Sequence, residues 1–134
     1  GSHVASTAAE HVIPVTYDGP DLAVVADRSE ISIAELIRRH TEATYRAEFC
    51  GFAPGFAYLS GLDPAMHTAR RASPRARVPR GSVAVAGPYC AIYPTDSPGG
   101  WQLIGRTEAI LFDPAAPHPA TVRPGDTVRF EVVR

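Results

Sequence analysis

The sequence predicts a mainly β protein, a closed or nearly closed β-barrel with two short helices near its N-terminus. Many short strand-like segments are separated by corners rich in glycine and proline, which number 11 and 13. Helix signals are confined to residues 20–43, and this combination is typical of barrels rather than of layered α/β folds. The 134 residues suit one domain, and a charged content of 20% is ordinary for a globular chain.

The first strand and the first helix are predicted on either side of a turn. Residues 12–17 (VIPVTY) predict a strand, which Pro14 restricts to a sheet edge or a strand start. A turn follows at residues 18–20. Pro20 has the fixed φ that suits the first position of a helix, so residues 21–26 are expected to form a helix of about two turns.

A second helix is predicted from the spacing of Ser32 and Glu35, which is that of a capping box. The Ser32 hydroxyl is expected to accept a hydrogen bond from the Glu35 N–H, while the Glu35 carboxylate reaches back to the Ser32 N–H. We therefore expect this helix to run from Ser32 to Glu42 or Ala43.

In residues 44–52 (TYRAEFCGF) the side chains alternate with a period of two, so that every second one would lie on the same face. This pattern predicts a strand that leads to Phe52. Residues 53–56 are then expected to form a tight turn in which Gly55 adopts a positive φ.

The second half of the chain predicts five more strands. Two of them flank a hairpin or corner at Gly87-Pro88, and the densest turn signal of the chain follows at residues 95–100. The predicted strands cover residues 82–86, 89–93, 101–106, 108–112 and 127–133.

Charge is unevenly distributed along the chain. Residues 51–107 carry six arginines against two aspartates, whereas the remainder carries seven arginines against twelve acidic residues. This basic centre indicates affinity for an anion, a carboxylate or an acidic protein surface. Most of its arginines lie in residues 69–81, where Pro74 and Pro79 predict an extended surface arm, neither a helix nor a central strand.

Five side chains in this stretch are candidate binding groups. Phe52 and Phe56 flank the tight turn, where they either present rings to a planar ligand or close one end of the barrel. Gln102 and Arg106 share a face if their strand is regular, which suits a small substrate with amide and carboxylate groups; the alternative is a polar pair on the barrel exterior. In the arm, Arg75 is the candidate for bidentate carboxylate binding, and most other arginines are expected to be solvated.

No catalytic signature accompanies these candidates. All 13 basic residues are arginine, which excludes a Schiff-base lysine and the lysine of a phosphate-binding loop. His40 and His67 have no metal or catalytic-triad spacing and are expected at a helix end and in a loop. Cys50 and Cys90 lie in apolar segments and are expected in the core. Basic and aromatic residues do not alternate, so we expect no nucleic-acid binding. No apolar run approaches the roughly 18 residues of a membrane helix.

Three blocks of the sequence resemble one known family in order and spacing. They are GFAPGFAYLSGLDP from Gly51, PRARVPRGSVAVAG from Pro74 and IYPTDSPGGWQLIGRT from Ile92. From about Ile13 to Val133 the chain resembles the KipI family, whose members are also called 5-oxoprolinase B-type subunits or allophanate hydrolase subunit 1.

The resemblance implies a cyclophilin-like β-barrel at residues 12–134, the C-terminal domain of that family. Residues 1–11 are expected to be a tag remnant and leader, the N-terminal α/β domain of the family to be absent, and the location to be cytoplasmic. The fold name implies no prolyl isomerase activity. The family motif covers seven candidate ligand- or partner-binding residues but gives none a catalytic role: Phe52, Pro54, Phe56, Arg75, Ser82, Gln102 and Arg106.

The function implied by the resemblance is that of a B-type subunit in an ATP-dependent bacterial 5-oxoprolinase, with A-type and C-type subunits as partners. The isolated domain is expected to be inactive and to hold no cofactor, while the complex uses ATP. One alternative is inhibition of a sensor histidine kinase, counteracted by the C-type, KipA-like partner. Another is a subunit of the allophanate hydrolase or urea amidolyase type. A small polar cleft favours the enzyme subunit, and an exposed apolar patch around Phe56 and Tyr58 favours the kinase inhibitor.

Overall fold

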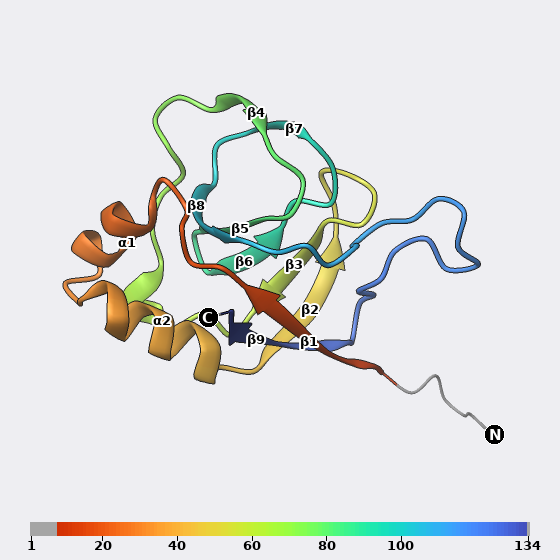
Figure 1. Ribbon diagram of the computed structural model, residues 1–134, viewed down its shortest axis with the longest axis horizontal. Helices are drawn as coiled ribbons and strands as arrows, with labels where there is room; N and C mark the ends of the chain where they lie inside the picture. The colour runs from red at the N-terminus through yellow and green to blue at the C-terminus, as the bar shows by residue number, and fades with distance from the viewer. Residues whose placement is uncertain (1–7, 134) are drawn as a thin grey trace.

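The computed structural model describes residues 8–133, so residues 1–7 of the expected tag remnant and leader (residues 1–11) lie outside the described part of the chain. Seven strands form one sheet (Figure 1). In spatial order they are β1 (Glu10–Val15), β9 (Thr127–Val132), β2 (Tyr45–Cys50), β3 (Ala57–Ser60), β6 (Tyr89–Ile92), β5 (Ser82–Ala86) and β8 (Gln102–Arg106). The β1–β9 pair is parallel and the other neighbours are antiparallel.

The two edges of this sheet meet, which curls it into a nearly closed barrel (Figure 1). Thr16, just beyond β1, and Arg106 of β8 exchange two backbone hydrogen bonds of 2.9 Å. Gly19 and Asp21 continue the contact, because their N–H groups donate to carbonyls of β8 at 3.1 and 2.9 Å. The predicted mainly β barrel is therefore confirmed. Pro14 lies on the edge strand β1, as its missing N–H requires.

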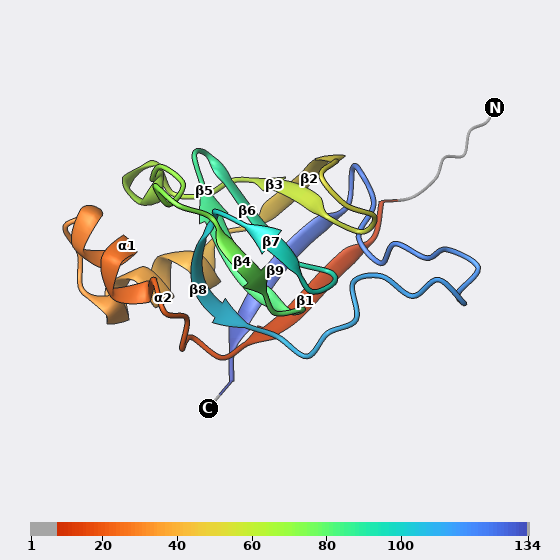
Figure 2. The same cartoon turned by 90° about the horizontal axis from the view of Figure 1, so that it is seen from above.

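Two helices lie side by side at one end of the barrel, α1 (Leu22–Arg28) and α2 (Ile33–Glu42) (Figures 1 and 2). The Ser32 hydroxyl accepts from the Glu35 N–H at 3.0 Å, as predicted. The other half of the capping box was wrong, because the Glu35 carboxylate instead accepts from Arg38 and Arg39. None of the described helices is long and apolar enough to cross a membrane.

The first helix was predicted at residues 21–26 and spans Leu22–Arg28, so Pro20 lies two residues before the helix and not at its first position. Asp21 is the residue that precedes the helix, but its side chain does not cap it. Both the backbone N–H and the carboxylate of Asp21 are hydrogen-bonded to Leu103 of β8 instead. The contact with the barrel therefore fixes where the helix starts.

A second, smaller sheet covers the outer face of the barrel. It is the β4–β7 ribbon, formed by β4 (Arg75–Val78) and β7 (Ser97–Gly99). The arginine-rich arm thus stays out of the main sheet, as predicted. Residues 97–99 were wrongly included in a turn, since they pair with β4 across the chain. A short 3-10 helix, η1 (Pro64–Met66), lies between β3 and the arm.

Two apolar clusters hold these layers together. The barrel interior and the inner faces of both helices form the larger cluster, which includes Leu36, Ile104 and Phe130. Between the barrel wall and the β4–β7 ribbon lies the smaller cluster, which consists of Phe56, Val78, Ala84, Ala86, Ala91, Tyr93, Trp101 and Leu103.

Two further sequence expectations were wrong. Residues 108–112 form no strand; Phe112 makes one isolated bridge with Ala120 in the loop that leads to β9 (Figure 1). Cys50 is exposed rather than part of the core, because the alternation of β2 is interrupted by a bulge between Ala47 and Phe49. Cys90 is buried, as expected.

Candidate functional site

Strand β8 is irregular, and this decides where its polar side chains point. Val83 of β5 pairs with Gly105, but the next residue of β5 pairs with Leu103, so Ile104 is an extra residue in β8. One extra residue reverses the alternation of faces. The expectation that Gln102 and Arg106 share a face was therefore wrong, and the two side chains line different hollows on the surface.

Asp21 lies between these two hollows and organises the charges around it. Its carboxylate accepts two hydrogen bonds from Arg75, at 2.8 and 2.9 Å, and one from the Leu103 N–H at 2.7 Å. Arg71 approaches at 3.3 Å. Burial alone would raise the pKa of the Asp21 carboxyl, but the bonds from Arg75 and Leu103 and the two guanidinium charges hold it below its ordinary value.

Sequence reasoning missed Asp21. An acidic residue that directly follows Pro20 at a helix start has a simple interpretation as a solvated first-turn carboxylate. The available signal was the excess of arginines in the arm, which need acidic partners if any of them is buried. In the structure Asp21 is only 3% exposed.

The first hollow is the arginine cleft, with a volume of about 330 Å³. It brings together three of the predicted site residues, Arg75, Ser82 and Arg106. Arg77, Arg80 and Asp18 also line it. Ser82 is buried and its hydroxyl donates to the Pro79 carbonyl at 2.7 Å, so this group helps to shape the cleft wall.

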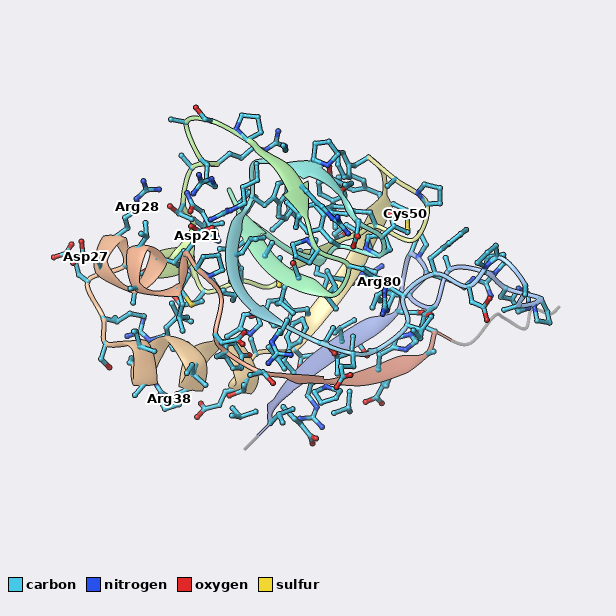
Figure 3. All side chains as sticks on the ribbon, turned by 45° about the horizontal axis from the view of Figure 1, so that its top comes forward. Asp21, Asp27, Arg28, Arg38, Cys50 and Arg80 are labelled. Carbon is cyan, nitrogen blue, oxygen red and sulfur yellow. The ribbon has the colours of Figure 1, made fainter. Side chains whose placement is uncertain are left out.

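The arginines of this cleft differ in how firmly they are held. Arg75 is fixed by Asp21, whereas Arg106 pairs with Asp18 at 2.8 Å and Arg77 pairs with Asp96, both at the exposed surface. The side chains of Arg77 and Arg106 are 76% and 61% exposed. The side chain of Arg80, which Figure 3 labels, makes no ion pair with any residue between 8 and 133, and only its backbone N–H bonds to Asp96. The cleft therefore presents cationic side chains that remain accessible to an acidic partner.

The second hollow is the Gln102 pocket, with a volume of about 350 Å³. It lies between α1, the arm and the start of β8. The polar residues that line it are Asp21, Arg28, Arg71, Ser73 and Gln102. The Gln102 side chain is almost fully buried, and its Nε2 donates to the Ala69 carbonyl at 3.1 Å.

The predicted aromatic residues lie in neither hollow. Phe52 is 62% exposed, with a positive φ of 66°, and Pro54 beside it is exposed as well. Phe56 is buried beneath the β4–β7 ribbon, where its ring contacts Phe52 and Trp101. The turn itself forms as predicted, with a φ of 83° at Gly55. The structure thus separates these aromatic side chains from the arginines, and a binding role for Phe52 and Pro54 stays a prediction.

Fold and site define a small barrel domain with a cationic surface and two polar hollows. Residues 2–122 match the family described as "Carboxyltransferase domain, subdomain C and D", and the chain belongs to this family. The membership indicated by the three sequence blocks is thereby confirmed.

Relatives and solved structures agree with this assignment. The chain is 51% identical over 121 residues to the B-type subunit of 5-oxoprolinase from Escherichia coli O157:H7, covering 88% of this chain and 56% of the relative. The crystal structure of the conserved uncharacterized protein PH0987 from Pyrococcus horikoshii is similar with a TM-score of 0.88 and 42% identity, covering 92% of this chain and 59% of that one. The K. lactis urea amidolyase structure shares the fold, with a TM-score of 0.80 and 23% identity, covering 94% of this chain and 10% of that one. The chain spans 50–58% of the length of its curated 5-oxoprolinase relatives.

Proposed function

We propose that this chain acts as part of the B-type subunit of an ATP-dependent 5-oxoprolinase, together with A-type and C-type subunits. The observation that carries the proposal is the 51% identity with a protein named as the B-type subunit of 5-oxoprolinase. In the proposed reaction, water opens the lactam ring of 5-oxoproline to give glutamate, and ATP hydrolysis by the complex drives it. ATP is a substrate of the complex in this proposal, and the isolated chain is expected to be inactive.

The arginine cleft is proposed to contact an acidic surface of the C-type subunit. Its outer side chains, Arg77 and Arg106, are highly exposed, which suits a protein surface better than a small enclosed ligand. Their present partners, Asp96 and Asp18, lie in exposed ion pairs that contribute little and exchange readily. An acidic partner could therefore replace these contacts at small cost.

The two alternatives receive less support from specific observations. The apolar patch that would favour a kinase inhibitor was expected around Phe56 and Tyr58, which are buried and half-buried. The rings of Phe49 and Phe52 contact them and are 44% and 62% exposed, so a small exposed aromatic group does lie there and this alternative stays a prediction. A urea amidolyase relative matches over 37% of this chain, less than half the coverage of the 5-oxoprolinase relatives.

Co-expression with candidate A-type and C-type subunits tests the proposal. We expect glutamate to form from 5-oxoproline only when ATP and all three components are present, and the chain to co-purify with the C-type subunit at low salt more than at high salt. ATP-dependent turnover by this chain alone, or full activity of the A-type and C-type subunits without it, would contradict the proposal.

A further inference from the structure

The amide orientation of Gln102 is fixed by its neighbour in the arm. The Ala69 carbonyl can only accept a hydrogen bond, so the side-chain nitrogen of Gln102 must be the atom that faces it, at 3.1 Å. The side-chain oxygen, Oε1, then points away from Ala69. It accepts no hydrogen bond from any residue between 8 and 133.

This oxygen is reachable from the Gln102 pocket. Within residues 8–133, no side-chain nitrogen or oxygen is fully enclosed without a hydrogen-bond partner. Gln102 is only 2% exposed, yet it lines the pocket, so the small accessible part of the side chain faces that hollow. A buried amide oxygen gains from a donor, because leaving it unpaired carries the cost of its lost hydration. The pocket floor therefore offers one acceptor to a ligand N–H.

Two guanidinium groups stand at the rim of the same pocket. Arg71 donates to the Ser73 carbonyl and to Asp21, both at 3.3 Å, which leaves one of its terminal nitrogens, Nη2, without a hydrogen bond in the described chain. Arg28 donates to the Thr68 hydroxyl at 3.1 Å and forms no ion pair among residues 8–133. Figure 3 shows Arg28 near Asp21, at the side of α1.

The negative charge of Asp21 does not cancel these cations. Arg75 already meets the Asp21 carboxylate with two short hydrogen bonds, and the Leu103 N–H occupies it further. The local balance at the pocket rim is consequently positive, which favours an anion. A carboxylate matches the planar donor pattern of a guanidinium.

From this geometry we propose that the Gln102 pocket binds a small ligand in which an amide N–H lies close to a carboxylate, with the N–H on Gln102 Oε1 and the carboxylate on Arg71 and Arg28. 5-Oxoproline has this arrangement of groups, and its choice as the ligand rests on the proposed function. The volume of about 350 Å³ lies near the lower end of the roughly 300–1,000 Å³ typical of small-molecule sites. The arginine cleft also offers anion contacts, but the buried Ser82 hydroxyl in its wall already hydrogen-bonds to the Pro79 carbonyl, whereas Gln102 Oε1 has no partner among residues 8–133.

The test uses three probes that dissect the ligand. The ¹⁵N-labelled chain is titrated with 5-oxoproline, with cyclopentanecarboxylate, which lacks the lactam, and with 2-pyrrolidinone, which lacks the carboxylate. We expect 5-oxoproline to shift the backbone amides of α1, residues 69–73 and the start of β8. Each truncated probe should bind roughly tenfold more weakly or worse, since it loses one set of polar contacts.

Three variants locate the contacts. Arg71→Ala should weaken 5-oxoproline binding by roughly tenfold or more, while Arg38→Ala, an exposed arginine of α2, should leave it unchanged. Gln102→Met keeps the shape of the side chain but removes its oxygen, so it should reduce the preference for 5-oxoproline over cyclopentanecarboxylate. If Gln102→Met does not fold, the probe series and Arg71→Ala decide the question alone.

Several outcomes would overturn the inference. These are shifts confined to the arginine cleft, equal binding of all three probes, equal effects of the two arginine variants, or no shifts with any probe. The proposed function is judged separately by glutamate formation in the reconstituted complex. An active complex in which Arg71→Ala binds and turns over 5-oxoproline normally would leave the proposed function standing and reject this pocket.

Discussion

Both terminal nitrogens of Arg75 donate to the carboxylate of Asp21, across 54 positions of the chain, at 2.8 and 2.9 Å. Arg75 belongs to the β4–β7 ribbon, and Asp21 belongs to the segment that joins β1 to α1. Since Asp21 also accepts from the Leu103 N–H, one carboxylate connects the ribbon, the helical end and the barrel wall. It also separates the arginine cleft from the Gln102 pocket, so it positions both candidate sites.

Removing the Asp21 carboxylate should destabilise the fold. In Asp21→Ala the Arg75 guanidinium and the Leu103 N–H lose their acceptor, and we expect the free energy of unfolding to fall by about 2–4 kcal/mol in urea denaturation. Asp18→Ala is the matched control, because Asp18 also pairs with an arginine but at the exposed surface. Equal stability of the two variants would show that the Asp21 contacts are not structural.

His40 should make the stability of the protein depend on pH. The imidazole is buried, stacked on Phe130 at 4.5 Å, and burial lowers its pKa from 6.5 to about 3. The unfolded chain binds a proton near pH 6.5 while the folded chain stays neutral, so unfolding takes up a proton and stability falls as the pH decreases below 6.5. The limiting slope is about 1.4 kcal/mol per pH unit.

The measurement is urea denaturation between about pH 7 and pH 5.5, a range above most of the ordinary titration of carboxylates. His40→Phe keeps an aromatic ring beside Phe130 and should flatten the slope. His118→Gln, in the loop before β9, should leave it unchanged. If the free energy of unfolding of His40→Phe depends on pH as steeply as that of the wild type, another group causes the effect.

Gly105 should tolerate no side chain, because β8 and the end of β1 approach closely there. A Cβ at this position would lie 2.6 Å from the Thr16 carbonyl oxygen and 2.9 Å from a methyl group of Val15. We expect Gly105→Ala to lower the free energy of unfolding by about 1–3 kcal/mol. Gly100→Ala, whose nearest neighbours lie at 3.6 Å, is the control and should change stability far less. Thermal unfolding by circular dichroism compares the two.

Arg106→Ala should affect association without affecting the fold. The side chain is exposed and its one ion pair lies at the surface, so thermal stability should match the wild type. If the arginine cleft contacts the C-type subunit, calorimetry should show binding weakened by roughly tenfold. Arg129→Ala, an exposed arginine of β9, controls for general charge effects. Identical losses in both variants would point to non-specific attraction.

Local signals in the sequence predicted local structure well. Ser32 and Glu35 are three residues apart, and the bond between them needs no information from elsewhere in the chain. Ile104 is the opposite case. It has the character of an ordinary strand residue, but it becomes the extra residue of a bulge because the partner strand β5 and the approach of Thr16 fix the register on either side. Because this constraint is non-local, the sequence wrongly indicated that Gln102 and Arg106 share a face of the strand.

The positive charge of the candidate site was predictable from the sequence, but its position was not. The surplus of arginines indicated an anion-binding surface, and three of the predicted residues do share a cleft. Which arginines remain available depends on acidic partners from distant segments, such as Asp21 for Arg75. Similarly, His40 lies in the last turn of α2, as predicted, but its burial against Phe130 and Cys90 depends on distant segments and was not predictable from the local sequence.

The two cysteines should differ sharply in reactivity. Cys50 is exposed, whereas Cys90 is buried with its sulfur 3.3 Å from His40 Nε2. Burial raises the pKa of both thiols, so neither is an activated nucleophile, and access decides the difference. With a chromogenic disulfide reagent at pH 8, one equivalent should react in the native state and a second only on unfolding. Cys50→Ser should abolish the first phase and Cys90→Ala the second. Rapid release of two equivalents from the native protein would show that the core around Cys90 opens far more readily than its complete burial implies.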